Sequence, residues 1–74
     1  MFTKLNAKVV IEYANNNMNQ AKTAKACYIS PSTTSFHLDN VYKHTGLNPR
    51  NFFDLVKLVP MAKEFLRKNN PLQT

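Results

Sequence analysis

Cysteine, glycine and acidic residues are scarce in this chain. Its 74 residues include one Cys, one Gly and four Asp or Glu, against ten Lys or Arg. A single cysteine excludes an internal disulfide framework and predicts a reducing, cytoplasmic setting. A single glycine excludes a glycine-rich phosphate-binding loop, and no two carboxylates are close enough in sequence to suggest an acid–base pair. We therefore expect no enzymatic activity and no cofactor.

Long apolar runs are also missing. No stretch approaches the ~20 apolar residues that a membrane-spanning helix needs. The N-terminal apolar residues are interrupted by Asn6, Lys8 and Glu12, which does not fit a signal peptide. The two histidines, His37 and His44, would lie about 10.5 Å apart along one helix, too far for both to bind one metal ion. We expect no membrane, metal or small-molecule ligand.

The size and the charge point to one small basic domain covering residues 1–74. A chain of this length buries only about 60% of its unfolded surface, and an all-α bundle of four to five helices suits it. The net charge is +6, spread as +1 over residues 1–17, +2 over 18–48 and +3 over 49–74. A distributed basic surface favours a polyanionic partner such as nucleic acid, although charge alone is weak evidence.

The stretch 19–46 has the pattern of two helices joined by a tight turn. Asn19 is a good N-cap for a helix over 20–27, and Ala21, Ala24 and Cys27 share one face of it. A capping serine followed by proline, Ser30-Pro31, starts a second helix over 31–45, which Gly46 ends. This spacing predicts a helix-turn-helix, whose second helix enters a DNA groove.

Small and apolar residues of this stretch are assigned to the core. Ala24 is expected at the close crossing of the two helices, and Cys27 is expected to be a buried, unreactive thiol. Ile29 should fill the space between the helices, and Met18 should pack as a staple ahead of the first cap. Tyr28 occupies the turn, where many helix-turn-helix proteins have glycine.

The second helix has one core face and one outward face. Thr34, Leu38, Val41 and Thr45 recur at helical spacing and form the core face. The candidates for base contacts lie near the start of the outward side: Ser32, Thr33, Ser35 and Phe36. Phe36 could equally belong to the core. The helix has no arginine to grip a guanine, so we expect modest sequence specificity.

Polar and basic residues around this helix are candidates for contacts with DNA phosphates. They are Gln20, Lys22, Lys25, Ser30, His37, Lys43 and Arg50. Such contacts fix the register of the protein on the duplex and carry no sequence information. For Lys22 and Lys25, the alternative is an ordinary solvated helix face. A phosphate contact by His37 would make binding stronger as the pH falls.

The flanking segments complete the predicted bundle. Thr3 can cap a helix over 4–15, which we interpret as a support for the core; the alternative is a dimer seam that includes Ile11. Asn48-Pro49 predicts another helix start, and Pro60 predicts a break, so two C-terminal helices are expected within about 49–69. One of the adjacent Phe52 and Phe53 is expected to be exposed. Residues 70–74 are expected to fray.

Several of these residues resemble the C-terminal helix-turn-helix of PucR/CdaR-type bacterial regulators. The resemblance covers about residues 18–66. It is carried by Ala24, 27–30, Thr33, Thr34, 36–38, Val41, 45–47, Leu58 and Ala62. It implies a double-stranded-DNA-binding transcription regulator of bacterial or phage origin, with His37 at the family's arginine position. Departures at Cys27, Ser30, Ser32, Thr34, Phe36 and His37 fall mostly on the second helix, so the resemblance does not imply an operator sequence.

Two further expectations follow. The chain has no room for the sensor domain that usually precedes this module, which suggests either a small stand-alone protein or part of a larger regulator. A homodimer is a possible form, because a single small module binds DNA weakly. The alternative function is a protein-interaction module that docks another regulator or a polymerase subunit, with Phe52 and Phe53 on its surface.

Overall fold

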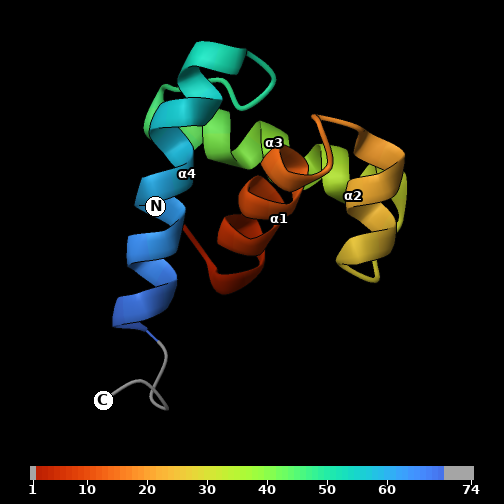
Figure 1. Cartoon of the computed structure of the whole chain (residues 1–74), viewed down its shortest axis with the longest axis horizontal. Coiled ribbons are helices and arrows are strands. Elements are labelled where there is room, and N and C mark those ends of the chain that lie inside the picture. Colours follow the sequence, from red (N-terminus) through yellow and green to blue (C-terminus); the bar gives the residue numbers. More distant parts are fainter. Residues whose placement is uncertain (1, 70–74) are drawn as a thin grey trace.

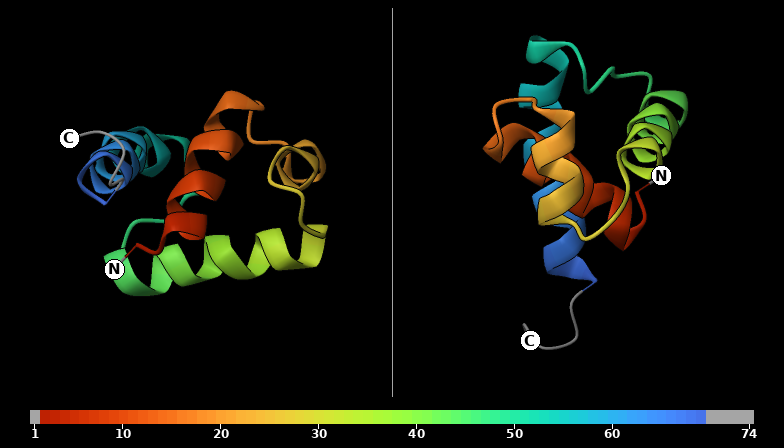
Figure 2. Two further views of the ribbon diagram at one scale, coloured as in Figure 1. Left: turned by 90° about the horizontal axis from the view of Figure 1, so that it is seen from below. Right: turned by 90° about the vertical axis from the view of Figure 1, so that its right-hand side faces the viewer.

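A computed structural model describes residues 2–69 as an arrangement of four α-helices (Figure 1). The helices are α1 (Lys4–Asn15), α2 (Gln20–Ala26), α3 (Pro31–Thr45) and α4 (Phe52–Lys68). Helix α1 packs against each of the other three, and α2 also packs against α3. Figure 2 shows α3 running along one side, with α2 at one end of it and α4 toward the other. The all-α prediction is confirmed, with four helices rather than five.

Side chains just ahead of the first three helices set where each one begins. Thr3, Asn19 and Ser30 each accept a hydrogen bond from the backbone N–H three residues later, at 3.1, 2.9 and 3.1 Å respectively. Each bond satisfies a donor that has no partner within the helix. Gly46 ends α3 with φ +76°, a conformation that favours glycine. The predicted starts of α1, α2 and α3 are therefore confirmed.

The core lies where α1 meets α3 and α4. Val9 and Val10 of α1, Leu38 of α3 and Leu58 of α4 are fully buried there. Complete burial of such side chains contributes about 1.5–3 kcal/mol each to stability. Ile11 is half-buried and packs against this core, which favours a supporting role for α1 over a dimer seam.

Most of the small and apolar residues around the turn lie where the sequence predicts. Ala24 and Cys27 are buried, and Met18 and Ile29 pack against the core. Ala21, which the sequence groups on one helical face with Ala24 and Cys27, is exposed. Helix α2 has only seven residues and turns a narrow face inward, and Thr23 takes the buried position beside Ala24.

Helix α4 corrects two predictions. The start at Asn48-Pro49 is wrong: Asn48 Oδ1 accepts from the Arg50 N–H to form a tight turn, and Asn51 caps the helix by accepting from the Asp54 N–H. The break before Pro60 is also wrong, since α4 runs through it as one helix.

Burial on both sides of Pro60 explains the continuous helix. A proline inside a helix costs about 3 kcal/mol. Leu55 and Leu58 before it and Ala62 after it are buried, and α4 packs against α1. Phe65 and Leu66 pack against the same core, so the burial gained after Pro60 depends on the helix continuing and works against that cost. Pro60 itself is exposed. The expectation that residues 70–74 fray lies outside the described residues. Within residues 2–69, each helix is too short or too polar to cross a bilayer.

Candidate nucleic-acid interface

The turn between α2 and α3 is closed by short-range hydrogen bonds. The Ile29 N–H donates to the Ala24 carbonyl at 3.0 Å, and Tyr28 adopts φ +58° with its side chain 90% exposed. The Gln20 side-chain amide donates to the Pro31 carbonyl at 3.0 Å, which ties the start of α2 to the start of α3. These bonds fix how α3 is presented relative to α2, in the arrangement of a helix-turn-helix.

The side of α3 opposite the core is open to solvent near its start. Ser32 is exposed, and Phe36 is 59% exposed. Phe36 therefore belongs to the outward side of α3 and not to the core. Thr33 and Ser35 are half-buried. The Ser30 hydroxyl donates to Thr33 Oγ1 at 2.8 Å and accepts from the Thr33 N–H, so these two hydroxyls are partly satisfied within the turn. The most accessible of the base-contact candidates are therefore Ser32 and Phe36.

Three of the lysines that are candidates for phosphate contacts are open to solvent. Lys22 and Lys25 of α2 and Lys43 of α3 are all exposed. Within residues 2–69, none of the three belongs to an ion pair. Their ammonium groups are consequently available to an external anion. Gln20 and Ser30 differ from them, because both side chains already hold internal hydrogen bonds.

His37 is joined to the first helix. Its Nδ1 is hydrogen-bonded to Oδ1 of Asn6, a side chain only 4% exposed. With the oxygen of Asn6 as acceptor, Nδ1 carries the proton and Nε2 is left for an outside partner. The Phe36 ring lies edge-on to the imidazole, with the ring centroids 5.6 Å apart. The role of Asn6 was not predicted, although its helical spacing from Val9, Val10 and Tyr13 places it on the buried face.

Arg50 lies against the outer side of α3. Its Nη1 donates to Asp39 Oδ1 at 2.7 Å and its Nη2 donates to Ser35 Oγ at 2.9 Å. The structure thus brings a guanidinium beside Ser35, a base-contact candidate, and beside Asp39. Arg50 and Ser35 were predicted as separate contacts, and the role of Asp39 as their partner was not predicted. Its position four residues after Ser35, on the same side of a helix, was the available signal.

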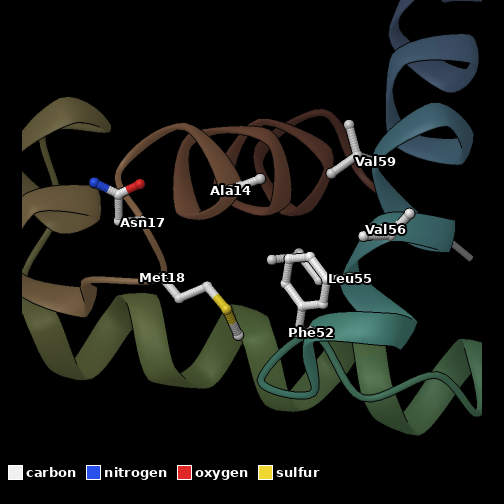
Figure 3. Close-up of a pocket in the computed structure, with 7 residues that line it drawn as sticks. All are labelled: Ala14, Asn17, Met18, Phe52, Leu55, Val56 and Val59. Carbon is white, nitrogen blue, oxygen red and sulfur yellow. The ribbon is translucent and has the colours of Figure 1, made fainter.

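An apolar groove of about 320 Å³ lies away from this surface, between the end of α1 and the first turns of α4 (Figure 3). Its lining residues are Ala14, Asn17, Met18, Phe52, Leu55, Val56 and Val59. Phe52 and Phe53 are 60% and 74% exposed, so both phenylalanines face solvent rather than one of them. Exposed aromatic side chains of this kind are typical of contact surfaces between proteins.

The chain matches one family model. Residues 7–59 match the model of the PucR C-terminal helix-turn-helix domain. This range includes most of α1, all of α2 and α3, and the first half of α4. No curated protein and no solved structure matches the chain significantly.

Proposed function

This chain belongs to the PucR C-terminal helix-turn-helix domain family, and on that basis we propose that it binds double-stranded DNA with α3 in the major groove. Membership of this family indicates a DNA-binding role in transcription regulation, and the family is one of binding domains rather than enzymes. The finer proposal concerns orientation: the exposed side of α3 contacts base edges while side chains of α2 and of the α3 end contact phosphates.

The observation that supports this orientation most directly is the exposed face of α3. Ser32 and Phe36 project to solvent near its start, whereas Thr34, Leu38 and Val41 on the opposite side are buried. A serine hydroxyl can donate to or accept from any base edge, and a phenyl ring can contact a thymine methyl group. These are permissive contacts, and they support recognition of a short, partly degenerate sequence.

The charges around α3 support the same orientation. Lys22, Lys25 and Lys43 supply exposed positive charge, and the acidic group on α3, Asp39, is paired with Arg50. A surface of this kind attracts the phosphate backbone and releases counterions from it. As an imidazolium, His37 donates from Nδ1 to Asn6 and has its Nε2–H as a further proposed phosphate donor. Gln20 and Ser30 remain candidates only where a hydroxyl or amide can serve a phosphate in addition to its internal partner.

Titration of duplex DNA at several salt concentrations tests the proposal. The logarithm of the association constant should fall linearly with the logarithm of salt concentration, by about 0.9 per phosphate contacted. Lys25→Ala should reduce this slope by about one contact. Lys63→Ala removes an exposed positive charge on α4 and is the matched control; its slope should equal that of the unsubstituted protein. Absence of duplex binding at low salt would refute the proposal.

A second copy of the chain is the proposed partner for the apolar surface of Phe52, Phe53 and Val56. All three side chains are more than half exposed. Two copies would place two recognition helices on half-sites about one helical turn apart, which increases affinity for a two-fold symmetric site. Sedimentation equilibrium of the unsubstituted protein and of Phe53→Ser tests this, because only the former should dimerise at micromolar concentration.

The same surface also favours a second candidate function. A helix-turn-helix scaffold can lose DNA binding and dock another regulator or a polymerase subunit instead. Phe52 and Phe53 would then provide the contact area, since buried aromatic side chains contribute strongly to protein interfaces. A chain that is monomeric in solution and has no affinity for any duplex would favour this alternative over the regulator.

A further inference from the structure

Arg50 is held at both ends. Its backbone N–H donates to Asn48 Oδ1 at 3.0 Å, in a loop whose Asn48 N–H in turn donates to Asp54 Oδ2 at 3.0 Å. Pro49, beside it, is fully buried. At the other end, the guanidinium is fixed by Asp39 and Ser35 of α3. These contacts favour the bound-like position of the guanidinium before any ligand arrives, so part of its rotamer entropy is already lost.

Stability does not explain this arrangement. The side chains of Arg50 and Asp39 are 34% and 66% exposed. An exposed ion pair of this kind contributes only about 0.2–1 kcal/mol to folding. Asp39 also stands four residues before Lys43 on α3, where a simpler pair within the helix was available, and its carboxylate bonds to Arg50 instead. The contact is better explained by what it does to the guanidinium.

The ion pair of Arg50 and Asp39 offers free N–H donors to a ligand but carries no net charge. Two of the five N–H groups of Arg50 are used by Asp39 and Ser35, which leaves three. Because the carboxylate cancels the positive charge locally, the pair is poorly suited to neutralising a phosphate. A fixed fork of N–H donors is well suited to paired acceptors on one base edge, and guanine O6 and N7 form such a pair in the major groove.

We propose that Arg50 recognises a guanine in the DNA site, with Asp39 as the residue that positions it. The proposal rests on the DNA-binding function and assigns to that site its principal specificity-determining side chain. It also supplies the arginine that α3 itself lacks: the guanidinium comes from the α3–α4 loop and lies along the outer side of α3. We therefore assign Arg50 to the base contacts and no longer to the phosphate contacts.

Substitution of Asp39 separates this role from simple electrostatics. Asp39→Asn removes a negative charge from a surface that faces a polyanion, so affinity for an arbitrary duplex should rise a few-fold. If Asp39 positions Arg50, the preference for guanine should collapse in the same variant. Arg50→Lys keeps the charge and removes the fork, so it should lose the same preference.

The experiment begins with selection from a random duplex pool. Dissociation constants are then measured for the selected duplex and for one with the guanine replaced. The unsubstituted protein should discriminate by about 10- to 100-fold, the range expected for one bidentate pair. Asp39→Asn and Arg50→Lys should each reduce this ratio to near one. The variant with both substitutions should lose no more discrimination between the two duplexes than either single variant, because the two residues act as a unit. Glu64→Gln removes an acidic charge on α4 and should leave the ratio unchanged.

The possible failures are distinguishable. If the unsubstituted protein binds no duplex, the proposed function fails and this inference fails with it. If the protein binds and Asp39→Asn retains full discrimination, the positioning role is refuted while the DNA-binding function stands. If Arg50→Lys or Arg50→Ala weakens all duplexes equally, Arg50 contacts phosphate and the proposed guanine contact is wrong.

Discussion

Asn6 in the first helix is hydrogen-bonded through Oδ1 to Nδ1 of His37 in the third, 31 positions away in the chain. Asn6 lies on the buried face of α1 and is only 4% exposed. The bond therefore satisfies a buried polar group and fixes the orientation of an imidazole on the side of α3. It connects the supporting helix directly to the proposed DNA-binding surface.

Loss of this bond should destabilise the protein. We expect Asn6→Ala to lower the free energy of unfolding by about 1–2 kcal/mol, because it removes a buried hydrogen bond and leaves a small void. Urea unfolding of Asn6→Ala, His37→Ala and the double variant measures how far the two residues depend on each other. Fully additive effects would show that the pair contributes nothing to stability.

Ala24 tests the packing of α2. Ala24→Leu adds atoms to a position that is 2% exposed, and overpacking should cost about 1–3 kcal/mol. Ala21→Leu introduces the same side chain on the exposed side of the same short helix and should change stability by less than about 0.5 kcal/mol. Thermal denaturation of both variants checks the prediction. Equal melting temperatures would contradict the placement of Ala24.

Tyr28 should be a strained residue with little role in the core. Its φ of +58° costs a non-glycine residue about 1–2 kcal/mol, and its ring is almost fully exposed. Glycine adopts this conformation freely but loses about 0.5–1 kcal/mol of backbone entropy on folding. Tyr28→Gly should therefore be neutral or stabilising by up to about 1 kcal/mol. Tyr28→Ala, which keeps the strain and removes the ring, is the control and should not be stabilising.

The thiol of Cys27 should make the stability of the protein fall with rising pH in the alkaline range. Burial raises the pKa of the Cys27 thiol above its ordinary value of 9.0; the charge of Glu12 also raises it, and that of Lys8 opposes the shift. The folded state thus holds the thiol proton more tightly than the unfolded state. This contribution to stability is complete below the unfolded-state pKa and is lost as the pH rises through the folded-state pKa.

Cys27→Ala isolates the effect from the other groups that titrate at high pH. Between about pH 8 and about pH 10, the unsubstituted protein should lose more stability than this variant does. The comparison uses chemical denaturation at each pH. Parallel curves for the two proteins would show that ionisation of the thiol is not linked to folding.

The sequence by itself determined where the first three helices begin. Thr3, Asn19 and Ser30 each bond to a backbone N–H three residues away, and a contact that short depends on residue type and local spacing alone. Periodicity also placed Leu38 and Val41 in the core correctly, because a helix repeats its faces whatever it packs against.

Only the tertiary structure decided which residues meet around α3 and how far α4 extends. The contacts of Arg50 with Asp39 and Ser35 span 11 and 15 positions, and that of His37 with Asn6 spans 31. Pairings over such separations depend on how the helices cross and on the path of the loop after Gly46, which local spacing does not specify. The same holds for Pro60, where burial of α4 against α1 outweighs a local preference to end the helix.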